Sequence, residues 1–118
     1  MLSITIPVLQ QSVDLLNILY LHNDGPETWM VYFDNSIQQC TIVPESLTHW
    51  EKLFPDFWRI NESYLINPAL IYRFHPADLP HFPLPLIEMV TGRTLAISPR
   101  KTKQILQKWE QKQPMFSA

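Results

Sequence analysis

Proline placement is the feature that most limits what this chain can fold into. Eleven prolines occur among its 118 residues, against two glycines. Because proline fixes φ and donates no backbone hydrogen bond, it divides the chain into short segments joined by stiff turns. Four prolines fall within Pro76–Pro85, so we expect that stretch to be a surface loop rather than a central strand. Many short elements of this kind favour a β or an α+β fold.

Length and composition indicate one folded domain spanning residues 1–118. Apolar residues make up 46% of the chain and aromatic residues 12%, which is enough to build a single core. Cys40 is the only cysteine, which excludes an intrachain disulfide and fits a reducing compartment. Its simplest interpretation is a small buried apolar residue. The apolar residues near the start lack Lys or Arg and are interrupted by Pro7, so we expect no signal peptide or membrane helix, and a cytoplasmic location.

Alternating or β-rich apolar runs separated by turn residues predict a series of short strands. Asn23–Pro26, Asp34-Asn35 and Thr91-Gly92 have the composition of turns, and the last two would each close a hairpin. A turn or a single helical turn is expected over Ser63–Asn67. The expected strands are Ser3–Ile6, Leu15–Leu21, Trp29–Phe33, Ile37–Val43, Phe57–Ile60, Leu70–Phe74, Leu86–Val90 and Thr94–Ile97.

Two helices are expected. Pro44 suits the first turn of a helix, and Leu47, Trp50 and Leu53 then share one face, which predicts a helix near 45–53 that packs onto a sheet.

The second helix would begin at Ser98-Pro99, with Ser98 as N-cap and Pro99 at the first helical position. Ile105, Leu106 and Trp109 would form its buried face. The predicted fold class is therefore mainly β with a minor α component (α+β): small packed antiparallel sheets, one helix near 45–53 and a C-terminal helix from 99.

Charge is distributed unevenly along the chain. The net charge of −2 alone argues against nonspecific binding to nucleic acid. Residues 1–58 contain one basic and seven acidic residues, a net charge of −6, whereas residues 59–118 contain eight basic and four acidic residues, a net charge of +4. The second half can therefore present a positive face to a polyanion, although a solvated charged helix beside an acidic sheet explains the same pattern.

The stretch from Phe57 to Ile71 has an unusual order of basic, apolar, small polar and aromatic residues. It resembles the signature of the LytTR family, whose members bind DNA with a small, mostly β domain. The chain departs from that signature at Asn61, where His is common, and at Glu62, where a basic or neutral polar residue is usual. A second segment, Val90–Lys101, resembles the strand, Gly turn, strand and helix start of the family, and the whole resemblance covers roughly Asn17 to Trp109. The matching signature residues are Phe57, Arg59, Ile60, Ser63, Tyr64, Leu65, Ile66, Asn67 and Ile71.

The resemblance implies sequence-specific binding to double-stranded DNA in bacterial transcription regulation, often by two chains on repeated sites. It implies that Arg100 enters the major groove, with Lys101 and Lys103 positioning the phosphate backbone. The other contact residues implied by the family are Asn61 and Ser63 in the signature turn, Thr28 in the loop before the third strand, and Arg59. For Arg59 a salt bridge within the protein is an equally good interpretation. Many relatives carry a receiver domain, and we expect none in this chain.

Other functions find little support in the sequence. The four histidines are scattered, no catalytic triad motif is present, and two glycines cannot build a phosphate-binding loop, so we expect no enzyme activity, no metal and no cofactor. The alternative to DNA binding is a protein-interaction module of the same fold. Glu27 and Glu62 in the implied contact loops favour that alternative, because carboxylates repel phosphate.

Overall fold

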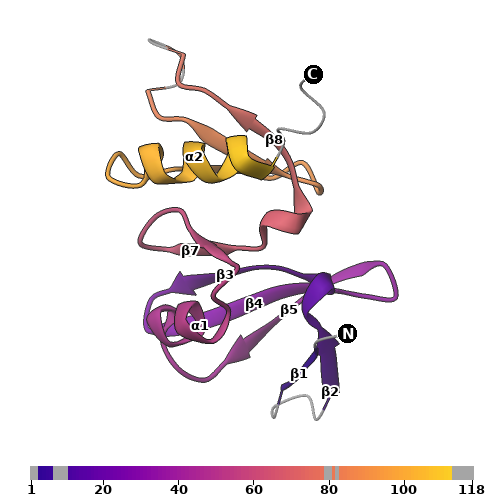
Figure 1. Ribbon diagram of the computed structural model, residues 1–118. Coiled ribbons are helices and arrows are strands. Elements are labelled where there is room, and N and C mark those ends of the chain that lie inside the picture. The colour runs from indigo at the N-terminus through magenta and orange to yellow at the C-terminus, as the bar shows by residue number, and fades with distance from the viewer. Residues whose placement is uncertain (1–2, 7–10, 79–80, 82, 113–118) are drawn as a thin grey trace. The chain divides into compact units, whose positions relative to one another are not determined.

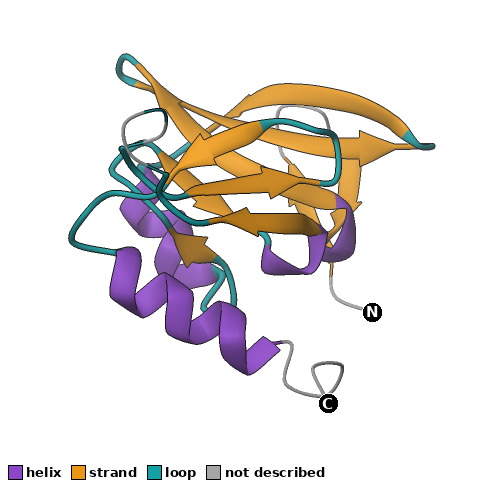
Figure 2. Cartoon of the chain, turned by 90° about the horizontal axis from the view of Figure 1, so that it is seen from above, coloured by secondary structure: helices purple, strands orange, loops and turns teal. Residues whose placement is uncertain are grey.

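In the computed structural model, which describes residues 3–6, 11–78, 81 and 83–112, the chain divides into two compact units. Unit 1 comprises Met1–Arg59 and Ser63–Leu70, and unit 2 comprises Ile60–Glu62 and Ile71–Ala118. Antiparallel strands dominate the regular structure, with helices as the minor component (Figure 2). The predicted fold class is therefore confirmed.

Unit 1 is built on one antiparallel sheet of five strands in the order β5-β4-β3-β7-β6 (Figure 1). A separate hairpin pairs β1 (Ser3–Ile6) with β2 (Gln11–Asp14). The strands of the larger sheet are β3 (Ile18–Asp24), β4 (Glu27–Asp34), β5 (Ile37–Val43), β6 (Trp58–Arg59) and β7 (Tyr64–Ile66).

Tight turns set the register of the three longest strands. Asn35 and Ser36 join β4 to β5, and their φ values of 52° and 66° are those that a type I′ turn requires. Gly25, with φ 62°, contributes to the turn between β3 and β4. Both hairpins follow the turn chemistry of the sequence, with the second turn one residue later than expected.

Two segments of unit 1 differ from the sequence-based expectation. The strand expected over Leu15–Leu21 begins only at Ile18, because the Asp14 carboxylate accepts a hydrogen bond from the Leu16 N–H and caps a 3₁₀ turn, η1 (Leu15–Asn17). The turn expected over Ser63–Asn67 is instead strand β7, which pairs with β3 through Tyr20↔Ile66 and His22↔Tyr64. Pairing with a distant strand here outweighs the local turn signal.

Helix α1 (Leu47–Leu53) follows the predicted helix but starts later. Glu45 has φ 74°, so Pro44 and Glu45 lie outside the helix, and Ser46 is the N-cap, its hydroxyl accepting from the His49 N–H at 3.3 Å. At the other end Phe54 donates its N–H to the Trp50 carbonyl, and Pro55 follows. A second 3₁₀ turn, η2 (Pro68–Leu70), closes unit 1.

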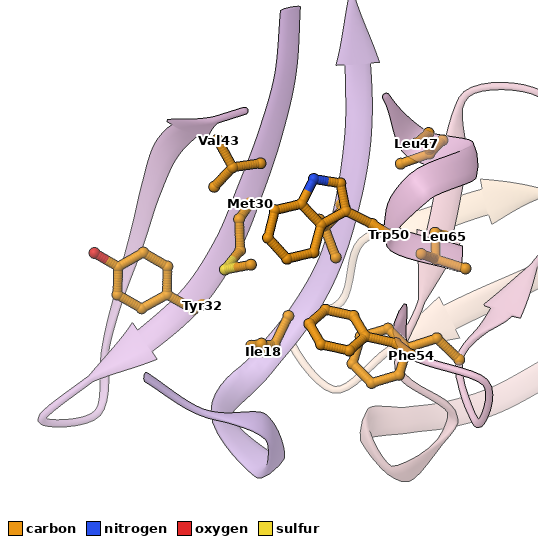
Figure 3. Packing of buried hydrophobic residues seen from close by; sticks show 10 residues of the cluster. Ile18, Met30, Tyr32, Val43, Leu47, Trp50, Phe54 and Leu65 are labelled. Atoms are coloured by element: carbon orange, nitrogen blue, oxygen red, sulfur yellow. The ribbon is translucent and has the colours of Figure 1, made fainter. Parts of the chain in front are cut away.

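The main core of unit 1 forms between α1 and the sheet. Trp50 extends from α1 toward Met30 and Ile18 of the sheet, and its indole N–H donates to the Pro44 carbonyl at 2.7 Å (Figure 3). Phe54 stacks obliquely on Phe57, with ring centroids 4.9 Å apart. Leu47 and Trp50 are buried as the helical spacing predicts, whereas Leu53, which was expected on the same face, is exposed.

Unit 2 contains a three-stranded antiparallel sheet in the order β10-β9-β8 and one helix. Gly92, with φ 91°, forms the turn between β9 and β10 and donates its N–H to the Met89 carbonyl at 2.9 Å, which confirms the predicted hairpin. The loop expected over Pro76–Pro85 lies partly outside the described residues, and its described part contains only an isolated bridge at Asp78. The elements are β8 (Ile71–His75), β9 (Leu86–Met89), β10 (Thr94–Ala96) and α2 (Thr102–Lys112).

Helix α2 begins at Thr102, three residues later than the sequence predicts. The Ser98 carbonyl accepts from the Lys101 N–H at 2.9 Å and from the Thr102 hydroxyl at 3.1 Å, so residues 98–101 form a turn ahead of the helix. Ile105 is buried as expected, but Leu106 is exposed, so the buried face is narrower than predicted. In the described part of the chain no helix is long and apolar enough to cross a membrane.

Candidate nucleic-acid interface

Positive charge belongs mainly to unit 2. This unit contains seven basic and four acidic residues, a net charge of +3, whereas unit 1 contains two basic and seven acidic residues, a net charge of −5. An approaching polyanion is therefore attracted by unit 2 and repelled by unit 1.

Two segments that the sequence separates come together in unit 2. The Ile60 carbonyl accepts from the Ser98 N–H at 2.9 Å, and the Asn61 side-chain amide donates to the Ala96 carbonyl at 2.7 Å. These bonds hold the loop 60–62 against the end of β10 and the start of the turn that leads into α2. The Asn61-Glu62 part of the signature turn and the Arg100 segment thus lie together within unit 2.

Arg100 lies at this junction with its guanidinium in solvent. The closest Arg100 Nη2–Glu62 Oε1 distance is 3.7 Å, and the two side chains are 81% and 88% exposed. An ion pair this exposed contributes little stability, because water and salt screen it. Arg100 is therefore available to a stronger acceptor, and Glu62 is the group that competes for it.

Two lysines extend the positive charge from Arg100 into α2. Lys101 is half-buried in the turn, and Lys103 is exposed in the first turn of the helix. No acidic residue lies in that first turn. The combination of one exposed arginine with flexible lysines suits a phosphate backbone with a base edge beside it.

The signature residues themselves are mostly hidden. Ile60, Leu65 and Ile66 are fully buried, and the buried Asn67 side chain donates to the Leu15 and Ile18 carbonyls and accepts from the Ala69 N–H. Because an unpaired buried carbonyl is costly, this asparagine is required by the fold of unit 1. The signature thus reports the architecture more than the contact surface.

Comparison with known proteins agrees with this architecture. The family model for the LytTr DNA-binding domain matches residues 11–110. The chain belongs to the LytTR family. A solved LytTr DNA-binding domain from Bacillus cereus has the same fold, with a TM-score of 0.68 and 18% identity, covering 80% of this chain and 83% of that one. No curated protein matches the chain.

The remaining implied contacts of the LytTR pattern lie in unit 1 and have structural partners there. Thr28 is buried in β4. The Arg59 guanidinium lies 3.1 Å from the Glu51 carboxylate, which is the salt-bridge interpretation of this residue. Ser63 is exposed, and its carbonyl accepts from the Asn23 N–H at 3.0 Å, which ties the signature turn to β3.

Three features of this LytTR chain were not visible in the sequence. Two of them are contacts between segments that lie far apart in the sequence. Glu62 pairs with Arg100, and Asn61 donates a hydrogen bond to Ala96, 35 residues away. Cys40 is exposed on β5, not buried as expected, because its side chain lies on the opposite strand face from buried Thr41 and Val43.

In the residues that the structure describes, no group of three His, Cys, Asp or Glu side chains is arranged to hold a metal ion.

Proposed function

We propose that this chain binds double-stranded DNA at specific sequences and regulates bacterial transcription, using the junction of loop 60–62 with the α2 start. The observation that carries the proposal is Arg100, which is exposed and, among the residues that the structure describes, is held only by a weak ion pair, in the basic unit of a LytTR-family chain. A basic side chain beside a helix start is a common way to reach the major groove.

Each residue at the junction has a distinct role in this proposal. Arg100 reads guanine through its O6 and N7 acceptors, because a guanidinium can donate to both at once. Lys101 and Lys103 contact phosphates and set the register of the chain on the duplex. Asn61 and Ser63 contact the phosphate backbone of the DNA. The hydrogen bond from Asn61 to the Ala96 carbonyl fixes the position of the loop.

Glu62 limits the affinity of this surface. It pairs with Arg100 in the free protein, and its carboxylate repels phosphate when DNA arrives. This carboxylate contributes to binding if it accepts a hydrogen bond from the N4 amino group of a cytosine. A site that contains guanine beside cytosine fits both side chains.

Two chains bind together on repeated sites in this proposal. A single small module contacts few base pairs, and pairing on neighbouring half-sites multiplies the discrimination against other sequences. The stoichiometry on a selected duplex tests this part separately from DNA binding.

Fluorescence anisotropy against a pool of random duplexes tests the proposal, at salt concentrations from about 50 to about 200 mM. The two phosphate contacts, from Lys101 and Lys103, predict a slope of log K on log salt of about −2. Arg100→Ala should lower affinity for a duplex selected from the pool by about 10-fold to 100-fold, which corresponds to about 1–3 kcal/mol.

Lys52→Ala is the matched control, since it removes one positive charge from an exposed position of α1 in unit 1. It should leave affinity unchanged. If both variants lost the same affinity for DNA, net charge alone would explain the binding. No binding at the lowest salt would reject the proposal and leave an interaction module of the same fold.

A further inference from the structure

The outer edge of β5 is open. β5 is the first strand of the five-stranded sheet, and in the described part of the chain only β4 pairs with it. Every second residue of an edge strand directs its N–H and C=O away from the sheet. The exposed side chains along β5 include Ile37, which is 61% exposed, and Ile42.

β5 also lacks the features that normally protect an edge. Proteins block edge pairing with short strands, charged residues, prolines or bulges. The seven residues of β5, Ile-Gln-Gln-Cys-Thr-Ile-Val, contain no charge and no proline. Its seven pairs with β4, from Asp34↔Ile37 to Thr28↔Val43, run without a register shift.

The other outer strands of the larger sheets are protected. β6, at the opposite edge of the same sheet, has two residues and carries Arg59. In unit 2, β10 has three residues, and β8 carries Arg73 beside a register shift. β5 is thus the one long, regular and uncharged outer strand among those that the structure describes.

We infer that β5 pairs antiparallel with β5 of a second copy of this chain, about a two-fold axis at Cys40. Cys40 is the middle residue of Ile37–Val43, so a full-length antiparallel pairing of two identical strands brings the two Cys40 residues opposite each other. Neither strand brings a charge that would repel the other. This inference concerns unit 1 and does not depend on DNA binding.

Cross-strand contacts of this pairing also cover exposed apolar surface. In the centred register, Ile37 lies opposite Val43 of the second copy, on the same strand face, and Ile42 lies opposite Gln38. Seven residues a side is far fewer than the roughly 20–30 a side of a standard interface. The pairing is therefore weak and depends on protein concentration, unless a shared DNA duplex raises the local concentration.

Oxidative cross-linking of the full chain tests the register directly. Opposite residues in antiparallel strands have Cα atoms about 4.5–5.5 Å apart, within the range that a disulfide spans. Because Cys40 is the only cysteine, every disulfide dimer must form through it. Copper phenanthroline oxidation, followed on non-reducing gels, should convert the native chain to a covalent dimer.

Moving the cysteine along the strand separates specific pairing from random collision. In Cys40→Ser with Gln38→Cys, the single cysteine faces residue 42 of the second copy, so the two thiols lie about 14 Å apart. This variant should cross-link about tenfold more slowly than the native chain. Adding Ile42→Cys should restore the rate, because residues 38 and 42 are then opposite.

Sedimentation equilibrium under reducing conditions provides the second measurement. Cys40→Lys should abolish self-association, because two lysines would face each other, whereas Cys40→Ser should associate as the native chain does. Because position 40 is exposed, both variants should fold like the native chain, so a difference between them reports on self-association. Equal cross-linking from positions 38 and 40, or association that Cys40→Lys leaves unchanged, would overturn the inference.

Discussion

The two units of this chain differ in charge and in how their residues are used. Unit 1 carries a net charge of −5 and contains the Trp50 cluster, in which α1 packs on the five-stranded sheet. Unit 2 carries a net charge of +3, and its helix buries Ile105 alone. The aromatic cluster and the edge strand that we propose for self-association thus belong to the acidic unit, and the surface that we propose for DNA belongs to the basic unit.

The LytTR signature crosses this division, which explains why it identifies the family better than it identifies contacts. Leu65, Ile66 and Asn67 are buried in unit 1. Asn61 and Glu62 belong to unit 2 and lie beside the α2 start. At those two positions the chain departs from the signature, whereas the buried Leu65, Ile66 and Asn67 match it.

The largest effect is expected from Trp50→Ala, which removes the aromatic anchor of α1. The substitution leaves a cavity and an unpaired Pro44 carbonyl, and should lower the free energy of unfolding by about 3–5 kcal/mol. Urea denaturation followed by circular dichroism measures the change. Leu53→Ala in the same helix, at a side chain that is 51% exposed, should change it by no more than about 0.5 kcal/mol. Similar losses in both variants would contradict the assignment of stability to this cluster.

Asn67→Ala tests whether the signature asparagine acts in folding. Three side-chain hydrogen bonds are lost, at about 1 kcal/mol each, so the free energy of unfolding should fall by about 2–3 kcal/mol. At a temperature where the variant is folded, its affinity for a selected duplex should equal that of the native chain. Asn17→Ala, at an exposed position, is the control for stability. A variant that keeps its stability but loses DNA affinity would move Asn67 to the contact surface.

Glu62→Gln should strengthen DNA binding by a few-fold, or about 0.5–1 kcal/mol, because it frees Arg100 and removes a repulsive charge. Glu45→Gln makes the same change in net charge at an exposed position of unit 1 and should have no effect on affinity. Anisotropy titrations of the three proteins on one duplex provide the comparison. Weaker binding by Glu62→Gln would instead mean that this carboxylate accepts a hydrogen bond from a base.

Tyr32 gives unit 1 a weakness at alkaline pH. Burial, and then the nearby Asp34 carboxylate, raise the pKa of its phenol above the ordinary value of 10.0. The folded state holds this proton more tightly, so the associated stability is full below pH 10.0 and is lost as pH rises through the folded pKa. Urea midpoints of Tyr32→Phe should fall less steeply above that pH than those of the exposed control Tyr72→Phe. Parallel curves would show that another group limits stability.

Local signals in the sequence predicted the parts of the fold that neighbouring residues determine. The Ile37–Val43 strand, the Asn35 turn and the aromatic face of α1 follow from alternation, turn chemistry and helical spacing. β7 was missed because its strand state depends on β3, more than forty residues away, as the Tyr20↔Ile66 pair shows. The start of α2 was misplaced because the Ser98 carbonyl is used in a turn first.

The candidate site was predictable in its residues but not in its geometry. Arg100 stood out by its helix-start context and Asn61 by its place in the signature. Their common location follows from the bonds Ser98 to Ile60 and Asn61 to Ala96, which no spacing rule contains. The open edge of β5 was also invisible, since the order of strands in a sheet is a property of the whole fold.

The proposal that DNA binds unit 2 and not unit 1 is tested most directly by nitrogen–proton correlation spectra. The isotope-labelled chain is titrated with a random-sequence duplex at low salt. The account predicts shifts of the backbone amides of residues 60–62, 98 and 100–103, with little change along β3, β4 and β5. Shifts confined to the strands of unit 1, or spectra unchanged by DNA, would contradict it.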